Sequence, residues 1–236
     1  MIVNKAALGG ALSICYADKD YPQLDCVCIE PDGTIVAINK HCIYCAEPVL
    51  ASVVSRLPFT KFGAPSVRVV LSSSAAIKLY KAIVVDRTFK GLLEHASLDV
   101  GAGGAIGCEL RDGKGTHALN LRALRSEYFD WKKSLDGTSH PAVGHQTVYN
   151  RKRLNYAVQA VESACKYDGS FAPVFVEHTG AGVLWRAINE LTGQRVLILF
   201  KDSKIKQEWP ALTPWEHSVL APKPIRRFFK QGVSSR

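Results

Sequence analysis

Two pairs of cysteines are the residues whose spacing comes closest to a metal-binding pattern. Cys26 and Cys28 stand two positions apart, and Cys42 and Cys45 follow with His41 beside them. Four thiolates from two close pairs could hold a tetrahedral zinc ion. Cys26 and Cys28 fall on one face of a predicted strand, however, whereas Cys42 and Cys45 point to opposite faces if their segment is extended. The sequence therefore favours small buried thiols, and we predict no metal and no cofactor.

Other patterns that carry chemistry are incomplete. The glycine-rich run over 101–107 lacks the Lys-Ser/Thr of a phosphate-binding loop and has Ile106 at the last glycine position of the dinucleotide pattern, so it is read as a hairpin loop. The sequence contains neither His-Glu-x-x-His nor Gly-x-Ser-x-Gly. Because no nucleophile has a base beside it in the sequence, we predict that the chain is not an enzyme.

Basic residues recur on or beside three predicted helices. The chain carries 30 Lys and Arg against 21 Asp and Glu, a net charge of +9, and such an excess favours a polyanionic partner. These residues could contact phosphates without reading bases, or they could form an ordinary solvated face. The candidate DNA-binding residues are Lys5, Lys78, Lys81, Arg151, Lys152, Arg153 and Lys166.

The predicted elements repeat one pattern three times: a helix followed by about three antiparallel strands. The predicted helices cover 4–15, 75–84 and 151–166. The predicted strands cover 24–30, 34–38, 42–46, 67–71, 91–99, 105–111, 117–123, 173–177, 183–187 and 195–200. We therefore predict an α+β fold built of repeated helix-plus-antiparallel-sheet units.

The three predicted half-units group into a domain of two half-units, a segment with the third half-unit, and a tail. Residues 1–125 are expected to form one domain from two half-units, about 1–50 and 66–125. Residues 126–205 then hold a connector and a third half-unit, and 206–236 form a basic tail. No window approaches 18 unbroken apolar residues, so we predict no membrane span.

The N-terminal residues 5–17 faintly resemble a secretory leader. The single positive charge, the Gly9-Gly10 pair and Ile14 just before Cys15 argue against that interpretation. An odd count of seven cysteines without dense spacing fits a reducing compartment. We therefore expect a cytoplasmic protein.

Two segments resemble the bacterial-type DNA sliding-clamp family. Residues 32–44, Asp-Gly-Thr-Ile-Val-Ala-Ile-Asn-Lys-His-Cys-Ile-Tyr, are similar to the family's strand ending in Ala-Thr-Asp-Gly-His-Arg-Leu. Residues 128–133, Tyr-Phe-Asp-Trp-Lys-Lys, are similar to its connector Phe-Pro-Asp-Trp-Arg-Arg. The layout after Asn150 also looks like the last half-domain of a clamp, and short clamp-like proteins of phages and prophages are the relatives that this resemblance suggests.

The sequence departs from the family pattern at several positions. Asn39 and Lys40 stand where the family has Asp and Gly, and Cys42 stands where it has Arg. Phe129 replaces a proline, and the closing Met-Pro-Met is replaced by residues 199–201, Leu-Phe-Lys. No partner-groove residues are therefore carried over from the family.

The resemblance implies a DNA-clamp fold and a homo-oligomeric ring of twelve half-domains around double-stranded DNA. Three half-domains per chain imply a tetramer, and two whole domains per chain imply a trimer. Such a ring contacts phosphates without reading sequence and serves DNA polymerase or other replication proteins as a processivity or recruitment platform. The alternatives are a clamp-fold interaction module without a ring, which modulates a host replication or defence complex, and a zinc-dependent module.

The tail contains a hydrophobic-x-x-Phe-Phe spacing in Ile225 to Phe229, similar to peptides that dock on clamps. Phe228 and Phe229 are therefore candidate partner-binding residues. Pro222 stands where that pattern has glutamine, so a plain basic tail that touches DNA is the simpler interpretation.

Overall fold

The computed structural model describes residues 1–57, 59, 67–85, 94–112, 114–135, 151–165, 174–179, 182–189 and 192–200 of the chain. The chain divides into two compact regions, Met1–Ser203 and Lys204–Arg236. The C-terminal region lies outside the described residues, so the description below concerns residues of Met1–Ser203.

The described residues form three units of similar order. The first contains β1 (Ile2–Asn4), α1 (Lys5–Ile14), β2 (Cys26–Ile29), β3 (Ile35–Ile38) and β4 (Cys42–Ala46). The second contains β5 (Val69–Ser72), α3 (Ser73–Ala82), β6 (His95–Val100), β7 (Ala105–Asp112) and β8 (Gly115–Arg122). The third contains α5 (Arg151–Ala164), β9 (Phe175–Thr179), β10 (Gly182–Ile188) and β11 (Arg195–Phe200).

Short helical turns lie between these elements. They are η1 (Pro22–Asp25), α2 (Ala51–Val54), η2 (Ala102–Gly104) and α4 (Trp131–Ser134). The turn η2 joins β6 to β7 in an antiparallel hairpin, as predicted for the glycine-rich run.

The strands form two antiparallel sheets that cross the unit boundaries. The four-stranded sheet has the order β1-β6-β7-β8, and the seven-stranded sheet has the order β5-β2-β3-β4-β11-β10-β9. Strand β1 of the first unit therefore joins the sheet of the second, while β5 of the second joins the sheet of the first. The third unit continues the larger sheet, because β11 pairs with β4 from Val196 opposite Ala46 to Phe200 opposite Cys42.

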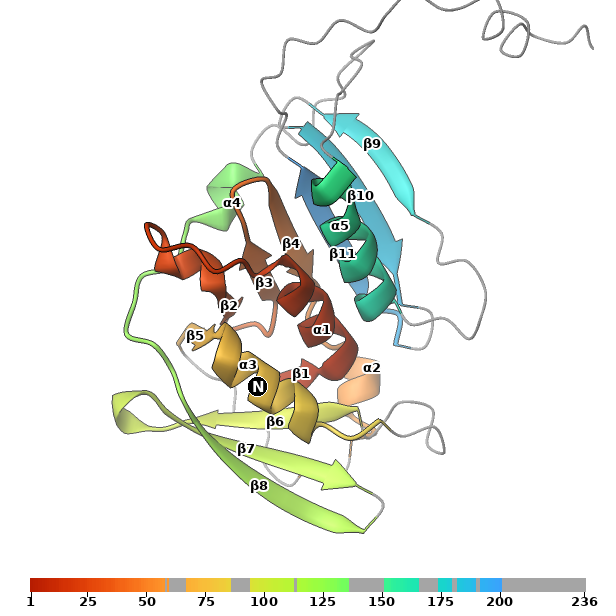
Figure 1. Cartoon of the computed structure of the whole chain (residues 1–236). Helices are drawn as coiled ribbons and strands as arrows, with labels where there is room; N and C mark the ends of the chain where they lie inside the picture. Colours follow the sequence, from red (N-terminus) through yellow and green to blue (C-terminus); the bar gives the residue numbers. More distant parts are fainter. Residues whose placement is uncertain are drawn as a thin grey trace, which may run out of the picture. The chain divides into compact units, whose positions relative to one another are not determined.

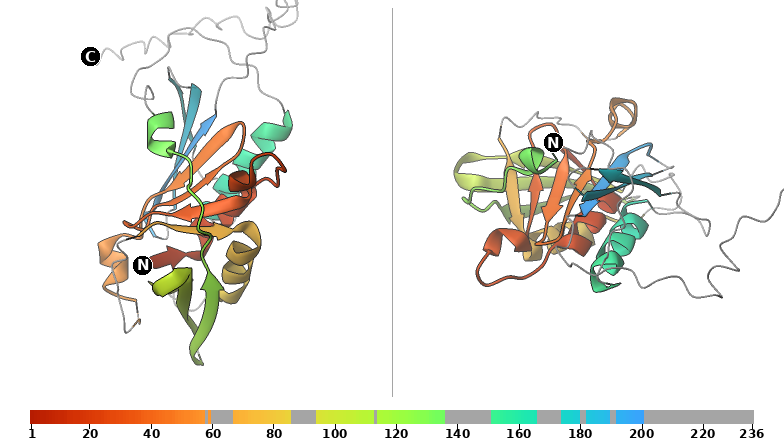
Figure 2. Two further views of the ribbon diagram at one scale, coloured as in Figure 1. Left: turned by 90° about the vertical axis from the view of Figure 1, so that its left-hand side faces the viewer. Right: turned by 90° about the horizontal axis from the view of Figure 1, so that it is seen from above.

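The three long helices lie side by side on one face of the sheets, with α1 between α3 and α5 (Figure 1). The turn α4 lies on the opposite sheet face (Figure 2). Two apolar clusters follow from this arrangement. The larger one fills the space between helices and sheets, and the smaller one packs Tyr128 and Trp131 of the connector against Cys26, Cys28 and Val36.

The central helix α1 packs closely on the sheet and on α3 because two glycines leave room for one aromatic ring of each, Tyr44 of β4 and Tyr80 of α3. A Cβ atom on Gly10 would lie 2.5 Å from the hydroxyl oxygen of Tyr44, and one on Gly9 would lie 2.9 Å from the ring of Tyr80. The hydroxyl of Tyr44 donates a hydrogen bond of 2.9 Å to the carbonyl of Ala7. The side chain of Asn4 caps the helix by accepting from the amides of its first turn.

The predicted α+β class is confirmed, and each predicted helix and strand is present with ends shifted by a few residues. Strand β1 was not predicted, because three residues before a helix carry no visible period. Ile77 and Val158 are apolar but each 40% exposed, whereas Leu79 and Val161 of the same helices are buried.

Candidate functional site

The helix face is the surface on which the sequence placed its basic residues. Helix α1 contributes no exposed residue to it, because α3 and α5 flank it and the sheets lie beneath it. The expectation that Lys5 carries its charge at the surface is wrong. Lys5 is 6% exposed, its ammonium donates to the carbonyl of Ile83, and it lies 4.8 Å from the centre of the Tyr80 ring.

Helix α3 presents both of its predicted cations. Lys78 and Lys81 are exposed one turn apart on the side away from the buried Leu79. The hydroxyl of Ser72 accepts from the amide of Ala75 and fixes the start of the helix. These two lysines are the exposed cations of the helix face among the side chains that the structure describes in α1, α3 and α5.

Helix α5 begins at the predicted basic triplet. Arg151, Lys152 and Arg153 form its first turn, and their side chains lie outside the described residues, as does Lys166. The described part of α5 exposes Asn155, Gln159 and Glu162. Its basic charge is therefore confined by the sequence to the two ends of the helix.

The opposite sheet face carries the connector through a buried polar contact. Trp131 begins α4, capped by Asp130, whose carboxylate accepts from the amide of Lys133. The indole of Trp131 donates 2.7 Å to the carboxylate of Glu30, which also accepts from Arg68 at 3.0 and 3.1 Å. Glu30 is 5% exposed, so the side chains of Trp131 and Arg68, with the thiol of Cys28 at 3.8 Å, satisfy a charge that is otherwise buried.

A groove of about 580 Å³ runs along this face beside the connector. It crosses β4, β11 and β10, so it spans the boundary between the first and third units. Its wall combines apolar side chains with charged ones at the rim, a composition typical of a site for a peptide or other ligand. The lining residues that define it are Trp131, Phe175, Arg186, Ile188, Arg195 and Leu197.

The cysteines do not converge on a common point. Cys26, Cys28 and Cys45 pack in the cluster on the connector side of the sheet, whereas Cys42 packs in the cluster beneath the helices. Burial raises the pKa of the Cys42 and Cys45 thiols to about 12, so both stay protonated at neutral pH. The four-thiolate arrangement considered from the sequence is therefore wrong, and no group of metal-ligating side chains is found among the described residues.

Two further expectations concern residues outside those described. Phe228 and Phe229 lie in the C-terminal region, Lys204–Arg236, which is outside the described residues. Within the described part of the chain, no helix is long and apolar enough to cross a membrane.

Sequence reasoning missed the residues that hold the connector and the sheet edges. Glu30 precedes a turn and looks like an exposed acid, and its contact with Trp131 joins residues 101 positions apart. The alternation of β9 was visible, but its position at the end of a sheet was not.

Comparison with known proteins gives structural similarity alone. No family model matches the chain, and no curated protein matches its sequence. A protein from Eubacterium rectale, provisionally named a DNA polymerase III beta subunit, is 16% identical over 86% of this chain and 50% of its own, with a TM-score of 0.39. This chain thus spans half the length of that protein.

Two PCNA structures match over nearly their whole length. Proliferating cellular nuclear antigen from Entamoeba histolytica is 9% identical over 85% of this chain and 96% of its own, with a TM-score of 0.49. The PCNA2–PCNA3 complex of Sulfolobus tokodaii is 10% identical over 85% of this chain and 98% of its own, with a TM-score of 0.47. Solved structures with which this chain shares similarity thus include a protein provisionally named a DNA polymerase III beta subunit and two PCNA structures.

Proposed function

We propose that this chain is a DNA sliding-clamp-like protein, which assembles with copies of itself into a ring around duplex DNA and acts as a processivity or recruitment platform. The observation that carries the proposal is the strand exchange between the first two units, together with a third unit that extends the same sheet. Among the described residues, that arrangement places three helices on one face, and β8 and β9 each stand at one end of a sheet order. Edges that face each other in copies can close an assembly.

The helix face is the part that would meet DNA. Lys78 and Lys81 of α3 are exposed there, and the sequence places Arg151 to Arg153 at the start of the other outer helix, α5. Lysines and arginines of this kind hold phosphates without reading bases, so the protein can move along the duplex and its affinity falls steeply with salt. No bond is made or broken in this activity.

The groove beside the connector would serve recruitment. Its lining residues Cys45, Trp131 and Leu197 pack in the cluster on the sheet face opposite the helices, so a partner bound there leaves the helix face free for DNA. Its charges are mixed, because Glu47 lines it beside Arg186 and Arg195 and Arg186 is paired with Glu177 at 2.7 Å, so the apolar side chains of a bound peptide would supply most of the contact.

Encirclement is tested by retention on capped DNA. The full chain is loaded at low salt on a linear duplex with biotin at both ends, the ends are capped with streptavidin, and salt is then raised. A ring stays on the capped duplex and leaves the uncapped one. Equal loss from both would show that the protein is held by phosphate contacts without encirclement.

The second candidate function is an interaction module that keeps the fold without a ring and modulates a host replication or defence complex. The buried state of Lys5 favours it, because α1 then adds no charge to the helix face. This function predicts a salt-insensitive protein complex formed through the groove, and a monomer in native mass measurements at micromolar concentration.

A further inference from the structure

The two strand exchanges between the first two units have the same backbone register. Asn4, the capping residue of α1, lies opposite His95, the first residue of β6. Ser72, the capping residue of α3, lies opposite Cys26, the first residue of β2. The two contacts therefore differ in the residue opposite the cap, which carries an imidazole in one and a thiol in the other.

The side chain of Asn4 contacts the helix and the imidazole at the same time. Its Oδ1 accepts from the amide of Ala6 at 2.8 Å and from the amide of Ala7 at 3.2 Å. These two bonds fix which end of the side-chain amide is the oxygen, so Nδ2 is the atom that lies 3.1 Å from Nε2 of His95. An amide nitrogen only donates, so Nε2 accepts, and the neutral ring carries its proton on Nδ1.

This contact is closed to solvent. His95 is 1% exposed and Asn4 is 2% exposed, and they form one of the three residue pairs that join β1 to β6. A protonated ring would set its own N–H against the donor Nδ2 and would lose the hydrogen bond. It would also place a positive charge where water does not reach it, which costs free energy.

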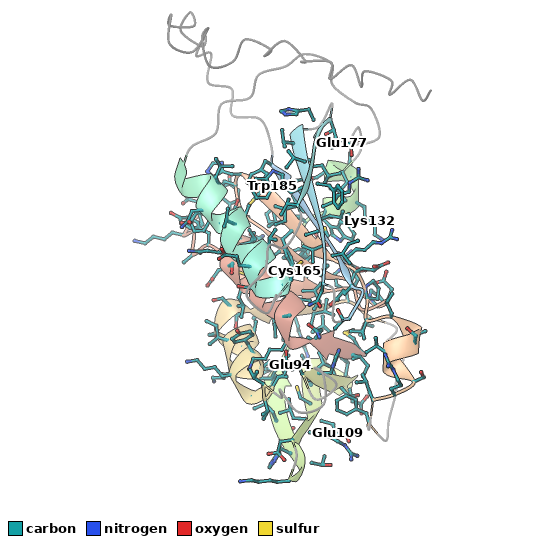
Figure 3. The ribbon with its side chains drawn as sticks, turned by 90° about the vertical axis from the view of Figure 1, so that its right-hand side faces the viewer. Glu94, Glu109, Lys132, Cys165, Glu177 and Trp185 are labelled. Carbon is teal, nitrogen blue, oxygen red and sulfur yellow. The ribbon has the colours of Figure 1, made fainter. Side chains whose placement is uncertain are left out.

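The charged groups around the contact do not favour a second buried cation. The ionisable groups described on the neighbouring elements are Lys5 of α1, the terminal ammonium of Met1, Glu94 and Asp99 of the β6 segment, Glu109 and Arg111 of β7, and Arg56 after α2. Lys5 directly follows Asn4 and is already buried with its positive charge. Glu109 is paired with Arg111 at 3.2 Å. Figure 3 shows Glu94 and Glu109 in the lower part of the view, where the smaller sheet lies.

We propose that His95 is a pH-sensitive latch between the first two units: the neutral ring holds Asn4 in its capping position, and protonation of the ring releases Asn4, which uncaps α1 and loosens the pairing of β1 with β6. A free imidazole takes up its proton near pH 6.5. The unfolded or locally opened chain therefore binds a proton below that pH which the closed contact excludes, so the contact is fully stable above about pH 7.5 and weakens as the pH falls. The latch needs neither DNA nor a ring, so its test is separate from that of the proposed function.

The second strand exchange is a control within the same chain. The hydroxyl of Ser72 accepts from the amide of Ala75 at 3.3 Å, and burial raises the pKa of the Cys26 thiol opposite it to about 11. Neither group changes its charge between pH 5.5 and 7.5. The cap of α3 is therefore expected to keep its strength over the range in which the cap of α1 weakens.

Hydrogen exchange of the capped amides tests the latch directly. In the full chain, the protection of the Ala6 and Ala7 amides, corrected for the intrinsic effect of pH on exchange, is expected to fall at least tenfold from pH 7.5 to pH 5.5, since uptake of one proton shifts an opening equilibrium by about tenfold per pH unit. The protection of the Ala75 amide is expected to change by less than about twofold, because no group at that cap titrates.

Two variants remove the titration and keep the cap. His95→Gln retains an oxygen that accepts from Nδ2 of Asn4 but takes up no proton in this range. Asn4→Asp is an equally good helix cap but presents an acceptor to the ring, so a protonated His95 gains a partner where the parent loses one. Both variants are expected to protect Ala6 and Ala7 at pH 5.5 as well as at pH 7.5. His117→Gln, at an exposed histidine that is bonded to Asp112, is the matched control and is expected to keep the response of the parent.

Three results would overturn the proposal. Full protection of Ala6 and Ala7 at pH 5.5 in the parent would show that no latch opens. An acid response in His95→Gln equal to that of the parent would assign the opening to another group. If His95→Gln does not fold, Asn4→Asp decides alone, and a response in it equal to that of the parent would exclude the contact between Asn4 and His95 as the cause.

Discussion

The indole nitrogen of Trp131 donates a hydrogen bond of 2.7 Å to the carboxylate of Glu30, and this contact ties the connector to the sheet. Trp131 is 8% exposed and Glu30 is 5% exposed, so the bond is made out of contact with solvent. Arg68 contacts both oxygens of the same carboxylate, at 3.0 and 3.1 Å, and is itself partly exposed. The connector is therefore positioned by one neutral donor and one cation on a single buried acid.

Replacing Trp131 by Phe tests the neutral donor. The variant keeps most of the apolar contact but removes the indole N–H, which leaves Glu30 with Arg68 and the thiol of Cys28 at 3.8 Å. We therefore expect a loss of about 1.5–3 kcal/mol, typical for a hydrogen bond to a charged group. Urea unfolding measures this loss, and limited trypsin digestion at the exposed Lys132 and Lys133 measures loosening of the connector. Phe129→Leu, at a ring that is 37% exposed, is the control and should change neither. A Trp131→Phe variant as stable as the parent would contradict this account.

Replacing Gly10 by Ala tests the close approach of α1 to the sheet. The added methyl would lie 2.5 Å from the hydroxyl oxygen of Tyr44, and that ring cannot move freely because it is fully buried and bonded to Ala7. Alanine favours a helix by about 1 kcal/mol over glycine, but overpacking costs about 1–3 kcal/mol. We expect a net loss of stability in urea unfolding.

Gly115→Ala is the matched control for that substitution, since no atom lies within 4 Å of the added methyl. Its stability should stay within about 0.5 kcal/mol of the parent. If Gly10→Ala changed stability as little as Gly115→Ala, helix α1 would be able to move away from Tyr44, and the predicted overpacking would be wrong.

The sequence predicted those features whose determining residues lie close together along the chain. The helix ends were predictable because Asn4 and Ser72 are capping residues beside apolar runs. The burial of Lys5 had a local signal that was passed over. Most residues of α1 itself are small or apolar, on every side of the helix, and a helix of that composition is buried all round.

Long-range pairing had no local signal. Ile2–Asn4 becomes a strand only because β6, more than 90 residues later, lies beside it. In the same way, nothing near Glu30 indicates that Trp131 will reach it. Pairings of this kind depend on the whole topology, so the place of β9 at the end of the sheet order of the described strands became apparent only from the structure.

Replacing the buried Lys5 should affect stability, whereas replacing the exposed Lys78 and Lys81 should affect DNA binding. Lys5→Ala removes a buried ammonium that donates to Ile83 and lies over Tyr80, so we expect it to lower stability by about 1–3 kcal/mol and leave the salt dependence of DNA binding unchanged. Lys78→Ala with Lys81→Ala should leave stability within about 0.5 kcal/mol, since both side chains are exposed.

Fluorescence anisotropy on a short duplex over a range of salt concentrations measures the second effect. The slope of log affinity against log salt should fall by roughly 0.9 for each phosphate contact that is lost. A Lys5→Ala variant that is fully stable but shifts this slope as much as the double variant would reverse the assignment of buried and DNA-facing lysines.

The buried thiols make stability fall at alkaline pH. Burial raises the pKa of Cys42 and Cys45 to about 12, from an ordinary value of 9.0 that the unfolded chain retains. Below pH 9 both states hold these protons, so the thiols add no pH dependence. Between pH 9 and 12 the unfolded chain loses protons that the folded chain keeps, and each thiol lowers the free energy of unfolding by about 1.4 kcal/mol per pH unit.

Urea unfolding under reducing conditions at pH 8.0, 9.5 and 10.5 measures this slope. The double variant Cys42→Ala with Cys45→Ala loses apolar contact and is less stable at every pH, but its slope above pH 9 should be shallower by about 2–3 kcal/mol per pH unit, since two thiols are gone. Burial raises the pKa of Tyr44 as well, so part of the decline persists in the variant. The same slope in parent and variant would mean that water reaches these thiols in the folded protein, which the tight packing of Cys42 beneath the helices and Cys45 beneath the connector side opposes.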